Sequence, residues 1–188
     1  GDISVMGTIF VDNLEPQSGT SLTLGASGDT IGLASGASQT LAVNTPAFEA
    51  YPSADLSVAS STSVKVQGNT ERFDTDSAYD NSSNYRFTPQ VAGRYFTYCS
   101  GTYNLVNGGI GLVVEIRKNG SAVLAGKIED GQYSGASNYK TITCQGVVQL
   151  NGSSDYLEMF TSTTSGLTRT LSADSQRTLF GAYKVLGT

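Results

Sequence analysis

The strongest constraint on the fold is an alternating apolar segment that ends in a turn signal. Between residues 110 and 117, apolar side chains recur at every second position, as in a strand with one buried face. The side chains of that face are Ile110, Leu112, Val114 and Ile116. Asn119-Gly120 follows, and this dipeptide favours a two-residue β-hairpin turn. Because no segment shows 3.6-residue periodicity over a helical length, the sequence predicts an all-β fold.

The same period of two predicts further strands along the chain. Residues 121–128 form the return strand of the hairpin, and residues 129–138 form a polar loop with an exposed Tyr133. Residues 139–150 form the next strand, and its apolar face consists of Ile142, Cys144, Val148 and Leu150. Residues 57–67 are predicted as a strand pair around a serine-rich turn. The remaining predicted strands are residues 156–161, 167–171 and 177–186.

A polar turn cluster lies between two aromatic segments in residues 71–98. A short strand at residues 72–74 leads into residues 76–84, whose Ser, Asn and Asp side chains favour turns. Phe87 follows, and after five intervening residues Gly93-Arg94-Tyr95 opens an aromatic strand. This order of residues resembles the signature of the C1q/TNF-like jelly-roll family.

Two other segments extend the resemblance to residues 45–188. Residues 46–51 look like the first strand of that family, and residues 178–183 look like its last. Thr97, Cys99 and Ala182 depart from the pattern, because the family prefers aromatic side chains at these positions. The resemblance implies an antiparallel jelly-roll sandwich of two sheets, formed by residues 45–188 as a head domain.

The resemblance also implies that the head assembles as a homotrimer. We expect the aromatic residues of the first and last strands to lie at the trimer axis. These residues are Phe48, Tyr51, Phe180 and Tyr183.

Residues 1–44 differ in composition from the rest of the chain. They contain no Lys or Arg, and their sparse apolar residues come in alternating pairs between Gly and Ser turns, such as Leu22 with Leu24 and Ile31 with Leu33. Each piece is too short to bury a face alone, so three copies could share one axis with these four side chains inside. The segment resembles the short motifs of phage tail-fibre proteins, which implies an extended β stem. A flexible Gly/Ser linker is the alternative.

The composition disfavours several functional classes. The chain of 188 residues has 11 basic and 16 acidic side chains, a net charge of −5, so binding to nucleic acid is disfavoured. Without any His, catalysis by Ser-His-Asp or Cys-His groups within this chain is excluded. No dinucleotide or phosphate loop is present, and no pair of acids can be placed across a cleft from sequence alone. We therefore expect no enzymatic activity and no cofactor.

The acidic residues of the turn cluster invite a calcium interpretation. Asp74, Asp76, Asp80 and Asn81 supply oxygen ligands, but the spacing lacks the Gly and Glu of an EF-hand loop. A turn explains these residues without a metal, so no metal site is expected. Three Asn-x-Ser sequences, at Asn81, Asn119 and Asn151, would matter only in a secreted eukaryotic protein.

Two cysteines are too few for a disulfide scaffold. Cys144 shares the alternation of its strand, so a buried free thiol is expected, while a mutual disulfide with Cys99 stays open. No apolar run reaches transmembrane length and no leader-like segment opens the sequence, so no membrane insertion is expected.

Taken together, these features predict a non-enzymatic structural protein of a phage virion. The stem would attach to other virion proteins, and the trimeric jelly-roll head would form a fibre tip that contacts a host-surface glycan or protein. A capsid decoration or head-fibre protein with the same architecture is the first alternative. A secreted C1q/TNF-like adhesion ligand is the second.

Overall fold

The structure is a computed structural model that describes residues 46–105, 108–133 and 138–185. The chain divides into two units, Gly1–Ala42 and Val43–Thr188, and every described residue belongs to the second unit. The predicted stem, residues 1–44 with Leu22, Leu24, Ile31 and Leu33, lies outside the described residues.

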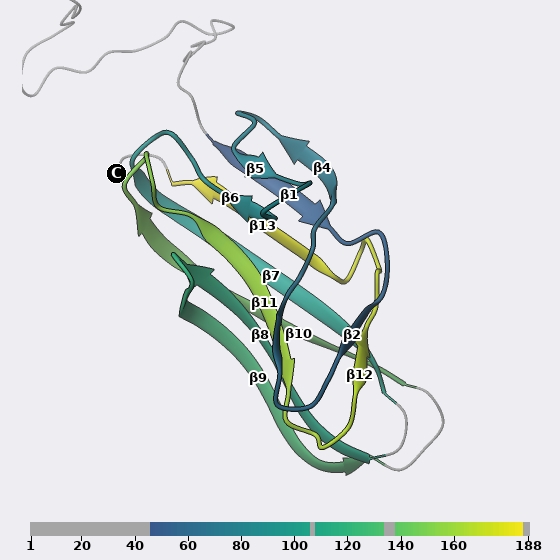
Figure 1. The fold of residues 1–188 in the computed structure, drawn as a ribbon. Coiled ribbons are helices and arrows are strands. Elements are labelled where there is room, and N and C mark those ends of the chain that lie inside the picture. The colour runs from purple at the N-terminus through teal and green to yellow at the C-terminus, as the bar shows by residue number, and fades with distance from the viewer. Residues whose placement is uncertain (1–45, 106–107, 134–137, 186–188) are drawn as a thin grey trace, which may run out of the picture. The chain divides into compact units, whose positions relative to one another are not determined.

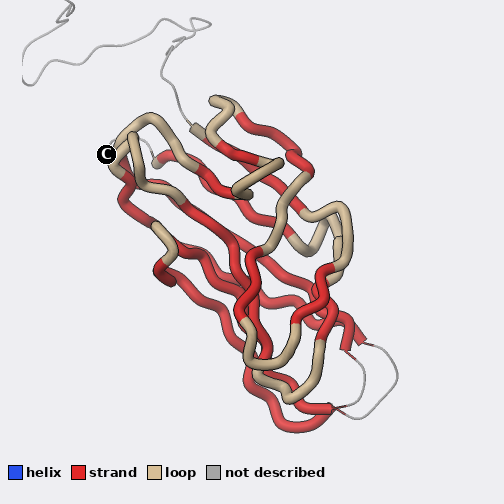
Figure 2. The backbone as a smooth tube through the Cα atoms, viewed as in Figure 1, coloured by secondary structure: helices blue, strands red, loops and turns tan. Residues whose placement is uncertain are grey.

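The regular secondary structure of the described residues consists of β-strands alone, as the alternating patterns predict (Figure 2). The strands are β1 (Ala47–Tyr51), β2 (Leu56–Val58), β3 (Ser63–Lys65), β4 (Thr70–Asp74), β5 (Tyr79–Asp80), β6 (Arg86–Phe87), β7 (Gly93–Leu105), β8 (Gly108–Lys118), β9 (Ser121–Tyr133), β10 (Asn138–Leu150), β11 (Leu157–Thr163), β12 (Arg169–Leu171) and β13 (Leu179–Lys184).

The strands form two packed sheets (Figure 1). The seven-stranded sheet has the order β2-β12-β7-β13-β1-β4, in which β12 and β13 share one edge of β7. β10 pairs with the opposite edge of β7. The six-stranded sheet has the order β5-β6-β11-β8-β9, and β3 pairs with β11. Every strand pair is antiparallel. The predicted jelly-roll sandwich is therefore confirmed.

Strand β7 holds the seven-stranded sheet together. β10 pairs with β7 along its whole length, from Gly93 to Leu105. The other edge of β7 is shared, because β13 pairs with its first half and β12 pairs near its end. One strand thus pairs with three others, two along one edge and one along the opposite edge.

The hairpin predicted at Asn119-Gly120 joins β8 and β9. Both turn residues have positive φ angles, 52° for Asn119 and 81° for Gly120, as a type I′ turn requires. The Asn119 side chain also donates to Asp155 at 2.7 Å and accepts from the main-chain N–H of Tyr156 at 3.0 Å. These contacts tie the hairpin to the start of β11.

Two local predictions are wrong. The segment 129–138 is not simply a loop, because β9 continues to Tyr133 and β10 begins at Asn138. Main-chain pairing with Gly108 and Gly109 extends the hairpin there, and such pairing needs no apolar side chains. The segment 57–67 is not a strand pair, because β2 joins the seven-stranded sheet and β3 joins the six-stranded one.

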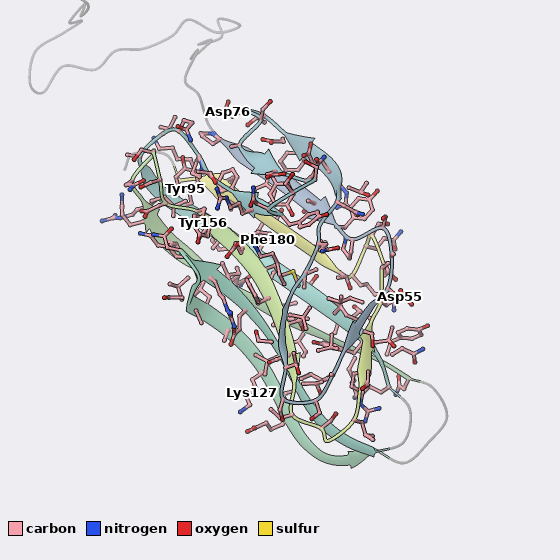
Figure 3. All side chains as sticks on the ribbon, viewed as in Figure 1. Asp55, Asp76, Tyr95, Lys127, Tyr156 and Phe180 are labelled. Carbon is pink, nitrogen blue, oxygen red and sulfur yellow. The ribbon has the colours of Figure 1, made fainter. Side chains whose placement is uncertain are left out.

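An aromatic cluster fills one end of the core. Phe48 stacks on Tyr79 at 4.5 Å and on Phe87 at 4.6 Å between ring centroids. Phe180 meets Phe48 edge-on at 5.0 Å, and Tyr95 meets Phe87 edge-on at 5.7 Å. Figure 3 labels Phe180 and Tyr95 within the sandwich. Phe48 and Phe180 come from one sheet and Tyr79 and Phe87 from the other, so this cluster joins the two sheets.

The assignment of Phe48 and Phe180 to a trimer axis is therefore wrong. Phe48 is 0% exposed and Phe180 is 3% exposed within the single chain, so a second copy cannot reach either ring. Their burial follows from register, since Phe48 is opposite Ala182 in β13 and Phe180 is opposite Cys99 in β7, and all four side chains are buried.

The aromatic cluster predicts a large effect of one core substitution. Phe48→Ala removes the central ring of the cluster and leaves a cavity, so we expect the free energy of unfolding to fall by about 3–5 kcal/mol. Urea denaturation measures this loss. Leu167→Ala, at an exposed position between β11 and β12, is the control and should change it by about 0.5 kcal/mol or less. Equal losses in the two variants would contradict the assignment of Phe48 to the core.

Candidate functional site

The outer face of the seven-stranded sheet carries an exposed aromatic surface. Along β7 the side chains alternate, so that Tyr95 and Thr97 are fully buried while Phe96 and Tyr98 point to the other face. Val147 of β10 and Tyr183 of β13 are both directly opposite Phe96. Opposite residues share a face, so these three side chains form one row across three strands.

The row is exposed and apolar at both ends. Val147 is 56% exposed and Tyr183 is 48% exposed. The Phe96 ring lies between them, 5.4 Å from the Tyr183 ring and 6.2 Å from the Tyr98 ring between centroids. We call Phe96, Tyr98, Val147 and Tyr183, with Phe73 of β4, the aromatic face.

Gly181 explains how Tyr98 crosses this face. A Cβ atom at Gly181 would lie 2.5 Å from the Tyr98 ring, so only glycine leaves room for the ring there. The Tyr98 hydroxyl reaches over Gly181 and donates to the Glu49 carboxylate at 2.6 Å. Arg72 forms an ion pair with the same carboxylate, and Phe73, 44% exposed, is opposite Glu49 in the sheet.

The carboxylate of Glu49 is thus neutralised within the aromatic face. Glu49 is buried, and Arg72 and Tyr98 satisfy its two oxygen atoms. Burial raises the pKa of Tyr98 well above its usual value, and the hydrogen bond to Glu49 raises it further. Because the charge is paired, the face can be covered without leaving an unpaired carboxylate.

The outer face of the six-stranded sheet is charged instead. Arg117 forms an ion pair with Glu115 at 2.7 Å, and its guanidinium lies 3.9 Å from the centroid of the Phe160 ring. Lys65 forms an ion pair with the buried carboxylate of Glu158. These charges cover Phe160 from two sides, so the two faces of the sandwich differ in character. The aromatic face is the better candidate for contact with another protein.

Sequence reasoning identified part of this surface. Tyr183 belongs to the aromatic face, and Tyr51, which is partly exposed, lies at the end of β1 with the Arg72 guanidinium 5.9 Å from its ring centroid. Phe96, Tyr98 and Val147 were missed. The signal was available in the run from Tyr95 to Tyr98, because burying Tyr95 and Thr97 must turn Phe96 and Tyr98 outward.

Two acidic residues at the turn cluster, Asp74 and Asp80, act as turn caps. The Asp74 carboxylate accepts main-chain N–H groups from Asp76 at 3.3 Å and from Tyr79 at 2.8 Å. Asp80 accepts main-chain N–H groups from three residues, Ser82, Ser83 and Asn84, at 2.9–3.0 Å. Hydrogen bonds from Ser83 and Ser82 hold the pKa of Asp80 well below its usual range. In the part of the chain that the structure describes, no group of three or more acidic or cysteine side chains could hold a metal ion.

None of the described residues belongs to a helix long and apolar enough to cross a membrane.

Comparison with known proteins identifies the fold. Murine APRIL superimposes with a TM-score of 0.53 and 15% sequence identity, over 76% of this chain and 100% of that chain. Eiger TNF from S. frugiperda superimposes with a TM-score of 0.55 and 10% identity, over 77% and 93%. This chain has a TNF-like jelly-roll fold. No protein-family model and no curated protein matches its sequence.

The raised pKa of Tyr98 predicts a loss of stability at alkaline pH. Below about pH 10, Tyr98 is protonated in both the folded and the unfolded chain, so its contribution to stability is complete. Above that pH the unfolded phenol ionises while the folded one keeps its proton, so the free energy of unfolding falls as pH rises.

Urea denaturation at pH 7, 9 and 11 measures this loss in the wild type and in Tyr98→Phe. The variant lacks the hydrogen bond to Glu49, so it should be less stable by about 1–2 kcal/mol at pH 7. It should also lose less stability than the wild type between pH 9 and pH 11. The same alkaline loss in both proteins would contradict a raised pKa for Tyr98.

Proposed function

We propose that the chain is a non-enzymatic structural protein whose jelly-roll head assembles as a homotrimer through the aromatic face. The observation that carries this proposal is the exposed row of Val147, Phe96 and Tyr183. Exposed apolar side chains on neighbouring strands mark a surface that another chain covers. The resemblance to the C1q/TNF-like family supports three copies.

A trimer requires a second surface on each copy, because a ring closes through head-to-tail contacts. The seam between β9 and β10 supplies a suitable surface. Each of these strands is the edge of its sheet, and the exposed side chain of Val123 lies along it. The seam of one copy against the aromatic face of the next would bury apolar surface on both.

We place this trimer in a phage virion appendage, as the tip of a fibre. The support is the resemblance of residues 1–44 to tail-fibre motifs, and the pairs Leu22 with Leu24 and Ile31 with Leu33 that three copies could bury together. These residues would join the head to other virion proteins. The head would then present its loops to a host-surface glycan or protein. A capsid decoration or head-fibre protein has the same architecture and differs in where residues 1–44 attach.

A structural role also fits the chemistry of the head. The chain has no His, and the carboxylates of Glu49, Glu115 and Glu158 are each held in an ion pair. Groups held in this way serve packing and charge balance and are poorly placed for acid–base catalysis.

A secreted adhesion ligand is the second candidate, and the likeness of the fold to murine APRIL and Eiger TNF favours it. Of the three Asn-x-Ser sequences, Asn119 and Asn151 use their side chains in turns, where Asn151 accepts three main-chain N–H groups at 3.0 Å. Asn81 is the sequence where a glycan would support this candidate.

A charge on the aromatic face should dissociate the trimer. Val147→Asp places a carboxylate within the proposed contact, where covering it leaves the charge unpaired, so we expect a monomer. Light scattering coupled to size-exclusion chromatography at micromolar concentration measures the mass, which should be three times that of one chain in the wild type.

Val113→Asp is the matched control, because Val113 is half-buried on β8 and faces outward from the six-stranded sheet. It should leave the trimer intact. A monodisperse wild-type monomer, or a trimer that persists in folded Val147→Asp, would overturn the proposed assembly.

Location is tested on intact particles. Antibodies raised against the head, residues 45–188, should label the tips of appendages on purified virions in negative-stain electron micrographs. Label spread over the capsid would select the decoration alternative. Particles without label, together with protein recovered from culture medium with a glycan on Asn81, would select the secreted ligand.

A further inference from the structure

Cys99 of β7 and Cys144 of β10 are directly opposite each other in the seven-stranded sheet. Both are free thiols, and their Sγ atoms lie 3.2 Å apart. Directly opposite residues of an antiparallel pair have Cα atoms about 4.5–5.5 Å apart, which is within the 4.4–6.8 Å that a disulfide spans. The two strands therefore need no rearrangement for a covalent bond between the sulfur atoms.

We propose that Cys99 and Cys144 form a modification site at which a small peroxide makes a reversible disulfide within the sheet. The inference does not depend on the oligomeric state of the protein. The free thiols and the mutual disulfide would then be two redox states of one pair.

The surroundings of the pair restrict the oxidant to a small molecule. Cys99 is 2% exposed and Cys144 is 7% exposed, so both thiols lie inside the sandwich. Strand β9 closes over β10 on both sides of Cys144. A Cβ atom at Gly126 would lie 2.2 Å from the carbonyl oxygen of Thr143, and one at Gly146 would lie 2.7 Å from Leu124. A bulky disulfide such as oxidised glutathione would have to separate β9 from β10, whereas hydrogen peroxide is close to water in size.

The two thiols are not equivalent. A hydrogen bond between them lowers the pKa of Cys144 and raises that of Cys99, with burial raising the latter further. Cys144 is also the more exposed of the two. Cys144 is thus the sulfur that reacts first, since the thiolate is the nucleophile.

The reaction balances with one peroxide. The Cys144 thiolate attacks one peroxide oxygen, the O–O bond breaks, and hydroxide leaves, which gives a sulfenic acid on Cys144. The sulfur of Cys99 then attacks the sulfur of Cys144, the S–O bond breaks, and the hydroxide takes the proton of Cys99 as water. Overall, two thiols and hydrogen peroxide give one disulfide and two waters, and the two sulfur atoms lose the two electrons that the peroxide gains.

The disulfide would constrain a long stretch of chain. The two cysteines are 45 positions apart, and the loop between them contains the whole β8–β9 hairpin. Closing a loop of this length lowers the entropy of the unfolded chain. We expect the oxidised protein to melt about 5–10 °C above the reduced protein.

The test uses the full chain, reduced and then treated with hydrogen peroxide while folded. After quenching in acid, the protein is denatured and its free thiols are labelled with a maleimide and counted by intact mass. We expect a single chain, not linked to another by a disulfide, that has lost two hydrogen atoms and accepts no label. The oxidised protein should also melt at a higher temperature. A dithiol reductant should restore both thiols and the original melting temperature.

A matched control keeps two buried cysteines but separates them. The double variant Thr97→Cys with Cys99→Ala moves one cysteine two residues along the same face of β7, diagonal to Cys144. Diagonal neighbours are about 7–8 Å apart, beyond the reach of a disulfide, so this variant should keep two free thiols. If it does not fold, the single variants Cys99→Ala and Cys144→Ala replace it, and peroxide should not raise the melting temperature of either.

Three results would overturn the proposal. The first is a wild-type protein that keeps both thiols free after prolonged exposure to peroxide. The second is oxidation of the thiols to sulfinic or sulfonic acids without a disulfide. The third is a rise in melting temperature in a single-cysteine variant equal to that of the wild type.

Discussion

The stacking of Phe48 between Tyr79 and Phe87 is the contact on which the head depends. Phe48 belongs to β1 in the seven-stranded sheet, and its two stacking partners belong to the short strands β5 and β6 of the other sheet. Aromatic pairs at these distances stabilise a core beyond the area that they bury. The polar turn between Tyr79 and Phe87 is ordered by the hydrogen bonds of Asp80, so the two rings reach Phe48 from a rigid support. Because β1 is fixed in this way, β13 and β7 follow in register beside it.

That register turns every second side chain of β7 away from the core. One set, with Tyr95, Thr97 and Cys99, packs inside, and the other set, with Phe96 and Tyr98, meets the exterior. The aromatic face is thus a direct result of the same alternation that builds the core. The outer face of the six-stranded sheet is charged instead, because ion pairs cover its outward residues. A sandwich with one apolar and one charged exterior has a defined direction in which it can join other chains.

Much of the fold could be predicted from local sequence. β8, β10 and the Asn119-Gly120 turn were all predicted correctly. In each case the pattern that determines the structure lies within about ten residues. The family resemblance located the first and last strands of the head. It could not decide which of their aromatic residues face inward, because a shift of one residue exchanges the two faces and register depends on partners far away in sequence.

The short strands show the same limit. β2 and β3 have three residues each and lie close together in the sequence, yet they belong to different sheets. Their partners, β12 and β11, come about a hundred residues later, and no local pattern contains that information. Phe96 and Val147 of the aromatic face were missed for a related reason, since they become neighbours only when β7 and β10 are paired.

The arrangement around β7 has a consequence for how the chain reaches its structure. The β8–β9 hairpin is the longest contact made between neighbouring segments, and such hairpins close within about 1–10 μs. Its closure brings the end of β7 near the start of β10 and shortens the loop that their ladder must close. β13 pairs with both β1 and β7 and follows every other described strand. During synthesis on a ribosome, β1 therefore cannot pair with β13 until the end of the chain has been made. During that interval β1 presents an open edge, and we expect a chaperone or a neighbouring nascent chain to meet it first.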